Sequence, residues 1–136
     1  KRNICVLATV SEGKPHCSLM SYVCDKEVRE IYMVSHKKTR KYANLMANPS
    51  VSLLIDSREE DRRTRRAYVK ALTVEGKFQR VGDAVKRDLI RARLLQTHPY
   101  LTEFIHDPEA EIFSIKVRSF QLLEGVKNSY FKTVDR

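Results

Sequence analysis

The sequence predicts a mainly β fold in which six antiparallel strands curl into a small β-barrel, accompanied by two or three short helices. Three observations lead to this prediction. Short apolar runs rich in β-branched residues are separated by Gly, Pro and Asp turn signals, which is typical of strands and hairpins. The strands follow one another without β-α-β alternation, which favours antiparallel pairing. Closing such a sheet into a barrel would remove its exposed edges.

The bulk composition is that of an ordinary globular protein. The length of 136 residues suits one domain, so we expect residues 1–136 to form a single domain. Hydrophobic residues make up 42% of the chain, and no apolar run approaches the roughly 20 residues that a membrane span needs. Cys5, Cys17 and Cys24 match neither a disulfide framework nor a CxxC metal site. We therefore expect three unpaired thiols buried in strands and a cytoplasmic protein.

The first half of the chain supplies three strands and a helix. Strands are predicted over residues 4–10, 17–24 and 30–35, with a turn built around Gly13 and Pro15 between the first two. From Thr39 to Asn48 the apolar period becomes helical, and Pro49 stops the helix. Its apolar face is formed by Tyr42, Leu45 and Met46, and its polar face carries Lys41 and Asn44.

Two more strands are predicted over residues 51–56 and 67–81. The second is long enough to bend, and Gly76 is the expected site of a bulge or corner. The stretch from Arg58 to Arg66 between them mixes basic and acidic residues, and we interpret it as a solvated loop.

The last third of the chain supplies one or two helices and a final strand. Asp83 is a suitable N-cap for a helix that ends near Thr97, and Pro99 can begin a further helical turn. The apolar face of the long helix is predicted to consist of Val85, Leu89, Ala92 and Leu95. The final strand alternates and then changes phase, so we expect a bulge near Ser119; its apolar residues are Phe113, Ile115, Val117, Phe120 and Leu122.

The candidate functional segment is the predicted junction between the third strand and the first helix. Ser35, Lys38, Thr39, Arg40 and Lys41 gather there, at the positive end of the helix dipole. Hydroxyl and basic side chains beside free backbone N–H groups can hold a phosphate monoester. The chain has only four Gly and no glycine-rich loop, which excludes a P-loop or a Rossmann dinucleotide turn.

The sequence argues against nucleic acid as a partner despite a net charge of +9. Its candidate contacts are Arg62, Arg63, Arg65 and Arg66, but acidic residues precede them and no aromatic residue stands among them to stack on bases. The four histidines show neither HxxxH nor HExxH spacing, so no metal site is predicted.

Three stretches together resemble the FMN-binding split barrel of the pyridoxamine 5'-phosphate oxidase-like proteins. They are LATVSEGKPHCSLMSYVCD (7–25), EIYMVSHKKTRKYANLMANPSVSLLI (30–55) and VEGKF (74–78), and the resemblance covers roughly residues 4–125. NPSVSLLI, which follows the basic helix, is its most specific part. The resemblance implies a six-stranded antiparallel split barrel that binds flavin mononucleotide (FMN).

The resemblance also implies which residues hold the flavin. Thr39, Arg40 and Lys41 match the hydroxyl-plus-basic triplet on the flavin phosphate, and Lys38 is a substitute ligand. Val34 and Ser35 match the strand end beside it. The backbone of Cys17, Ser18, Leu19 and Met20 matches the strand along the isoalloxazine ring, and Lys70 is a candidate for its pyrimidine edge. Ser18 stands where the family's oxidases carry an arginine, so the grip is expected to depend more on the basic triplet.

The function implied by the resemblance is that of an oxidoreductase acting on an unidentified small molecule, as a homodimer with the flavin at the interface. The true oxidases hold their substrate with a C-terminal segment containing Trp and Arg. This chain has no Trp, so we do not expect pyridoxamine 5'-phosphate oxidase activity itself. The alternative is a non-catalytic flavin- or haem-binding module, since related split barrels bind haem and His or Cys can be axial ligands.

Overall fold

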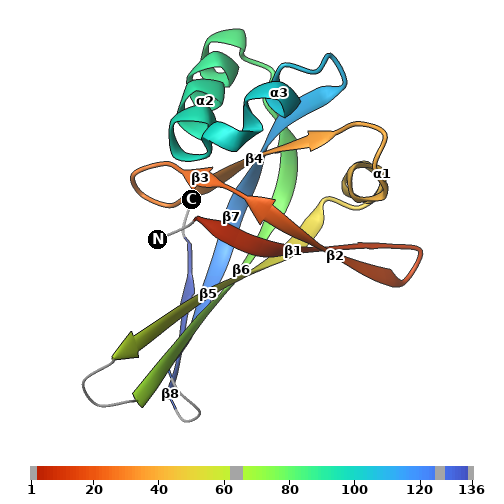
Figure 1. The fold of residues 1–136 in the computed structure, drawn as a ribbon. Helices are drawn as coiled ribbons and strands as arrows, with labels where there is room; N and C mark the ends of the chain where they lie inside the picture. Colours follow the sequence, from red (N-terminus) through yellow and green to blue (C-terminus); the bar gives the residue numbers. More distant parts are fainter. Residues whose placement is uncertain (1–2, 62–65, 125–127, 135–136) are drawn as a thin grey trace.

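A computed structural model describes residues 3–61, 66–124 and 128–134, without the side chains of 57–61, 66–70, 124 and 128. In this part of the chain eight strands form one curled antiparallel sheet (Figure 1). Its order is β2-β1-β5-β6-β7-β4-β3, and β8 pairs with β7. The strands are β1 (Ile4–Ser11), β2 (Lys14–Ser21), β3 (Val23–Cys24), β4 (Glu30–His36), β5 (Ser50–Asp61), β6 (Arg66–Arg80), β7 (Ala110–Glu124) and β8 (Asn128–Thr133).

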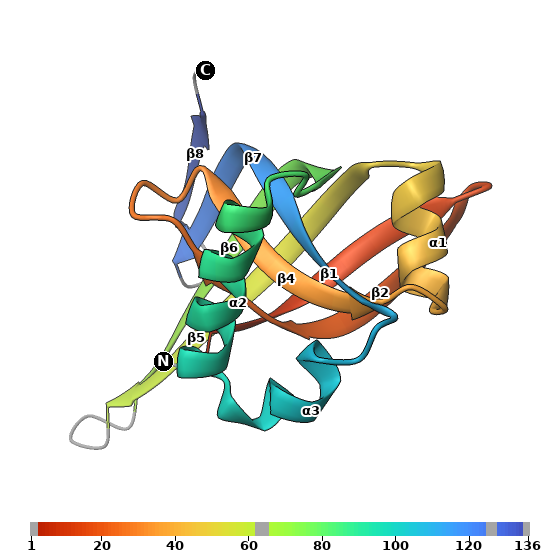
Figure 2. The same cartoon turned by 90° about the horizontal axis from the view of Figure 1, so that it is seen from above.

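Three α-helices accompany the sheet in the described residues, as the sequence predicts. They are α1 (Arg40–Ala47), α2 (Ala84–Thr97) and α3 (Thr102–Ile105), with the 3-10 turn η1 (Pro99–Leu101) between the last two. Thr39 and Asp83 cap α1 and α2 with side-chain oxygens that accept backbone N–H groups. Figure 2 shows α1 at one end of the sheet beside β1 and β2, and α2 lying across β4.

Several predicted strand limits are wrong. The stretch 17–24 is divided into β2 and β3, and β8 was not predicted at all. The predicted loop from Arg58 to Arg66 is mostly strand, because β5 continues to Asp61 and β6 begins at Arg66 in an extended ladder. Of the four candidate nucleic-acid contacts, Arg62, Arg63 and Arg65 lie outside the described residues, as does the side chain of Arg66.

The sheet encloses one hydrophobic core and packs a second one against α2. Alternation along each strand puts every other side chain inside, as in β1, where Cys5 and Leu7 are buried. The inner core also contains Met33, Leu53, Val74, Phe78, Phe113 and Ile115. The outer core lies between the sheet and α2 and contains Val23, Tyr32, Val34, Ile90, Leu94 and Ile112.

The predicted apolar face of α2 is wrong except at Leu95, which packs against the outer core as expected. Val85 and Leu89 are 69% and 64% exposed and Ala92 is also exposed, whereas Ile90 and Leu94 are buried. The sequence carries two apolar stripes on this helix, and period alone cannot say which one meets the sheet. Tertiary packing selects the stripe that fits against Val23, Tyr32 and Val34.

The prediction for α1 needs a smaller correction. Tyr42 and Leu45 are buried as expected, but Met46 is exposed. Asn44, expected on the solvated face, is buried and donates a hydrogen bond from Nδ2 to Thr9 Oγ1 at 3.2 Å. A buried amide is tolerated because this hydrogen bond replaces water.

The expected bulges in the two long strands coincide. The register shifts between Glu75 and Gly76, because Glu75 pairs with Ser119 and Gly76 pairs with Val117, which makes Arg118 the extra residue of β7. A Cβ atom at Gly76 would lie 2.5 Å from the carbonyl oxygen of Lys116, so only glycine fits this close approach. Both the corner at Gly76 and the bulge near Ser119 are confirmed.

The three cysteines are unpaired, as predicted, but only one of them is buried. Burial raises the pKa of the Cys5 thiol to about 12, so it behaves as a small hydrophobic residue. Cys24 is half-buried, and Cys17 is exposed because it lies on the outer face of β2, opposite Ala8. The expectation that Cys17 is a core residue is therefore wrong.

The carboxylate of Glu30 is expected to stabilise the fold only above about pH 4. Burial alone would raise its pKa, but hydrogen bonds from Ser114 Oγ at 2.8 Å and Lys86 Nζ at 3.0 Å outweigh burial and lower it. A carboxylate whose pKa is lower in the folded state than in the unfolded state stabilises the fold at pH values above its unfolded-state pKa. This stabilisation is lost as the pH falls through its folded-state pKa. In urea unfolding, the deficit of Glu30→Gln relative to the unmutated chain should shrink between pH 7 and pH 3; a constant deficit would contradict this prediction.

Candidate functional site

The turn from β4 into α1 is fixed by its own hydrogen bonds. The Thr39 hydroxyl donates to the carbonyl oxygen of His36 at 2.9 Å and accepts the backbone N–H of Tyr42 at 3.2 Å. The backbone N–H of Thr39 also donates to His36 O, at 3.2 Å. The first turn of α1 is therefore held with its N–H groups directed out of the helix end.

The two hydroxyls predicted to meet a phosphate are engaged inside this turn. Ser35 is fully buried, and its Oγ lies 3.3 Å from both His36 O and Thr39 Oγ1. The Thr39 hydroxyl both donates a hydrogen bond, to His36 O, and accepts one, from the backbone N–H of Tyr42. In this conformation both side chains shape the turn, and the groups left for an anion are backbone N–H groups and basic side chains.

Lys41 is the most unusual charge at this junction. Its ammonium group is half-buried and donates to the thioether sulfur of Met20 on β2, at 3.2 Å. Burial lowers its pKa, and no carboxylate among the described residues pairs with it. A half-buried cation with only a weak, neutral acceptor is well placed to receive an anion.

The rest of the junction adds positive potential. Lys38 and Arg40 are exposed, and no acidic residue stands in the first turn of α1. The helix dipole contributes in the same direction, since the partial positive charge lies at the N-terminus. Lys38, Arg40 and Lys41 together with this helix end therefore form one cationic surface, which we name the α1 cradle.

β2 brings the second part of the predicted site to the cradle. It is an edge strand that pairs with β1, so one row of its N–H and C=O groups faces away from the sheet. Met20 points inward beneath Lys41, whereas Leu19 is 74% exposed, Cys17 is exposed and Ser18 is half-buried. The strand thus offers main-chain polar groups and one exposed leucine next to the cradle.

Of two further predicted site residues, one has its side chain in the outer core and the other has a side chain outside the described part. Val34 is adjacent in sequence, but its side chain is buried in the outer core with Ile90 and Leu94. Lys70 lies in β6 opposite Ser57 and Glu124, and its side chain falls outside the described part. A role for Lys70 at the flavin ring stays a prediction.

Sequence reasoning missed a polar chain that ties α1 to the start of β7 and the end of β6. The Tyr42 hydroxyl donates to Glu111 Oε2, and Arg80 Nη2 donates to Glu111 Oε1 at 2.9 Å. Burial and this hydrogen bond raise the pKa of Tyr42 to about 12. Burial alone would raise the pKa of Glu111, but its two donors lower it. The three residues are remote in sequence, so no local pattern indicates the contact.

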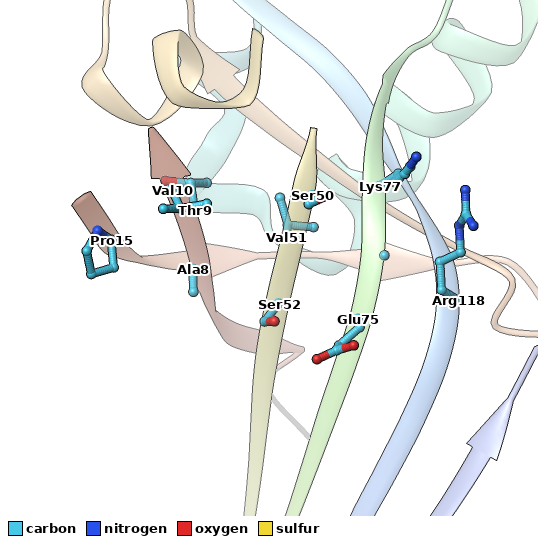
Figure 3. A pocket seen from close by; sticks show the side chains of 11 residues that line it. Ala8, Thr9, Val10, Pro15, Ser50, Val51, Ser52, Glu75, Lys77 and Arg118 are labelled. Atoms are coloured by element: carbon cyan, nitrogen blue, oxygen red, sulfur yellow. The ribbon is translucent and has the colours of Figure 1, made fainter. Parts of the chain in front are cut away.

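A shallow cavity of about 420 Å³ lies on the outer face of the sheet, and no cradle residue lines it (Figure 3). Figure 3 shows Glu75 and Arg118 on one side of it and Pro15 on the other. Its other lining residues include Ala8, Val10, Ser50 and Ser52. Small side chains on β1 and β5, together with Gly76, leave this part of the sheet hollow.

An apolar row crosses the same outer face. Val6 on β1 pairs with Leu19 on β2 and with Leu54 on β5, so the three side chains lie side by side. Leu19 and Leu54 are exposed and Val6 is half-buried. We refer to these three residues as the outer row.

Comparison with known families decides the relationship. A family model described as "Pyridoxamine 5'-phosphate oxidase" matches residues 1–123. The chain belongs to this family. The match includes both the α1 cradle and β2, and it ends before β8.

Solved structures confirm that the chain has the split-barrel fold of this family. A heme-binding protein from Mycobacterium smegmatis has a TM-score of 0.81 at 20% identity, over 96% of this chain and 52% of that one. A FAD-binding protein from Mesorhizobium loti has a TM-score of 0.70 at 20% identity, over 91% and 87%. HutZ, the heme storage protein from Vibrio cholerae, has a TM-score of 0.72 at 20% identity, over 87% and 83%.

The present chain spans about half the length of the Mycobacterium protein. No curated protein sequence matches it. Within the described ranges, no helix is long and apolar enough to span a membrane. The described residues also contain no group of three or more His, Cys, Asp or Glu side chains that could hold a metal ion.

Proposed function

We propose that this family member binds FMN with its phosphate in the α1 cradle and its ring along β2, and that it is an oxidoreductase acting on a small molecule. The observation that carries the proposal is the half-buried ammonium of Lys41, which meets only a thioether within the described residues. A phosphate dianion would supply the missing countercharge. The three free thiols favour a cytoplasmic location.

The junction between β4 and α1 could contact a phosphate with basic side chains and with backbone N–H groups. Arg40 and Lys41 would provide charged donors, and their own backbone N–H groups have no hydrogen-bond partner among the described residues. Thr39 and Ser35 would hold the turn in shape, since their hydroxyls are engaged with His36. Lys38 would add charge from the rim of the cradle.

A bound flavin supplies hydride and electron transfer, which the described side chains do not provide by themselves. The chain's contribution would be to orient the ring. The free edge of β2 from Cys17 to Met20 offers N–H and C=O groups along one line, and Leu19 offers an apolar surface. The strand end at Val34 would fix the distance between the ring and the cradle.

We further propose that the protein works as a homodimer with the flavin at the interface. β2 is an edge strand and Lys38 and Arg40 are exposed, so one chain would cover only part of a flavin. The outer row leaves apolar side chains exposed on the neighbouring face, which a second copy would bury. Lys70 could then act on a ring held by the other copy.

Haem is the second candidate, because two of the similar structures are described as a heme-binding and a heme storage protein. Those proteins share only the fold with this chain at their 20% identity. We rank FMN first, because basic side chains beside free backbone N–H groups at a helix N-terminus are a typical phosphate site.

An absorption spectrum before and after incubation with FMN and gel filtration tests the proposal. We expect retained flavin bands, with one FMN per chain. Reduction of that flavin by NADPH under anaerobic conditions would support an oxidoreductase, while retention without reduction by nicotinamides would support a flavin carrier. A Soret band after incubation with haemin, without FMN retention, would replace FMN by haem.

A further inference from the structure

A second cavity, of about 490 Å³, lies where the end of β6, the start of β7 and the turn after β4 meet α2. In Figure 1 this is the region where β6 runs into α2. Four basic residues line it, namely Lys37, Arg80, Arg87 and Arg91, together with the single acid Glu111. Lys38, Arg40 and Lys41 of the α1 cradle do not line this cavity, although its lining residue Glu111 accepts a hydrogen bond from Tyr42 of α1.

The basic side chains converge from three segments of the chain. Lys37 follows β4, and its backbone N–H donates to Glu109 O at 2.8 Å, which ties this residue to the start of β7. Arg80 is the last residue of β6. Arg87 and Arg91 are four positions apart on α2, so they share one face of the helix.

The nearby carboxylates do not neutralise this group. Glu111 accepts from Arg80 and from the Tyr42 hydroxyl, and Arg91 pairs with Asp88 at 2.5 Å. Arg87 donates to the backbone carbonyl of Val81 at 3.1 Å and not to a carboxylate of the described residues. Four cations therefore face two carboxylates, which leaves a surplus of two positive charges.

Asp83 does not alter this balance inside the cavity. Its side chain accepts the backbone N–H groups of Val85 and Lys86 as the N-cap of α2, and it is not a lining residue. Arg87 and Arg91 carry like charges at i, i+4, which repel each other weakly on a helix surface, and Asp88 pairs with Arg91. The cavity wall beside them is apolar at Val81 and Ile112, which strengthens electrostatic attraction.

We propose that this cavity is a second anion site, which binds a small phosphate-bearing molecule. Guanidinium groups bind phosphate oxygens in a bidentate fashion, and two of them on one helix face with a lysine opposite can surround a phosphate. The volume is within the range of small-molecule sites. The inference does not depend on flavin binding, because it concerns other residues.

Titration of the ¹⁵N-labelled full chain with inorganic phosphate, and separately with phenyl phosphate, tests the site. We expect saturable shifts in the amide signals of Gly82, Ala110 and Ile112 that chloride at equal ionic strength does not produce. Shifts confined to the amides of Arg40 and Lys41 would place the anion in the α1 cradle and overturn the proposal. The absence of a saturable shift would also overturn it.

Paired variants separate a built site from general attraction to a basic protein. The double variant Arg87→Gln with Arg91→Gln should bind phenyl phosphate about tenfold more weakly or worse. Lys14→Gln with Lys26→Gln removes the same charge from exposed positions outside the cavity and should change binding less than about twofold. Equal weakening in both pairs would overturn the proposal.

A third variant tests whether weaker binding could come from a folding defect in α2. Lys37→Gln removes a cation from the opposite wall, outside the helix. It should weaken phenyl phosphate binding by about threefold or more while the thermal unfolding midpoint stays close to that of the unmutated chain. Unchanged binding in this variant, together with unchanged binding in the arginine pair, would show that the cavity does not hold the anion.

Discussion

Replacing Phe113 with alanine is expected to lower the free energy of unfolding by about 3–5 kcal/mol. Phe113 is fully buried at the centre of the inner core, and its ring centroid lies 5.3 Å from that of Phe78. Removing the ring takes away its transfer free energy and leaves a cavity that the surrounding strands cannot close, because Ile115 and Met33 are fixed in the same sheet. Urea unfolding followed by circular dichroism measures the loss.

Phe131 provides the matched control for this variant. It lies on β8 and is 69% exposed, so Phe131→Ala should change the free energy of unfolding by less than about 0.5 kcal/mol. Similar losses from both variants, or a loss below about 1 kcal/mol for Phe113→Ala, would contradict the position of the inner core.

The double variant Arg40→Ala with Lys41→Ala is expected to lose about 3 kcal/mol or more of FMN affinity, or roughly a hundredfold in Kd. Each side chain would contribute one charge-assisted contact to the phosphate, worth about 1.5–3 kcal/mol. Lys41 should account for the larger share, because its ammonium is half-buried and Arg40 is exposed to screening by solvent. Quenching of flavin fluorescence during titration gives both dissociation constants.

The control for this loss must remove two positive charges elsewhere. Lys14→Ala with Lys26→Ala does so at exposed positions and should shift the FMN dissociation constant less than about twofold at 150 mM salt. Circular dichroism should show that α1 persists in the cradle variant, since Thr39 still caps the helix. Unchanged FMN affinity in a folded cradle variant would reject the phosphate assignment.

The elements that could be predicted are those whose signals are local. The limits of α1 follow from Thr39 and Pro49, and the start of α2 follows from Asp83, because caps and helix stops act on neighbouring backbone groups. The face of α2 could not be predicted, since Val85 and Leu89 are as apolar as Ile90 and Leu94. The choice between the stripes depends on the outer surface of β3 and β4.

Only part of the candidate site could likewise be predicted from local sequence. The triplet Thr39, Arg40 and Lys41 is contiguous, so residue types alone indicate an anion site. The contact of Lys41 with Met20 joins residues 21 positions apart, and the Tyr42–Glu111 hydrogen bond joins residues 69 apart. Such contacts depend on the strand order. Local sequence patterns do not show whether a strand pairs with its neighbour in the sequence or with a distant strand.

The pairing of β4 with β7 has a consequence for how fast the chain reaches its native state. The hydrogen bond between Glu30 and Ser114 on these strands joins residues 84 positions apart, whereas β1 and β2 form a hairpin around a turn of two residues. The entropy of closing so long a loop must be overcome before the ladder between β4 and β7 can form. Refolding is therefore expected to be slow, on the order of milliseconds to seconds, with the N-terminal hairpin acquiring structure ahead of the barrel.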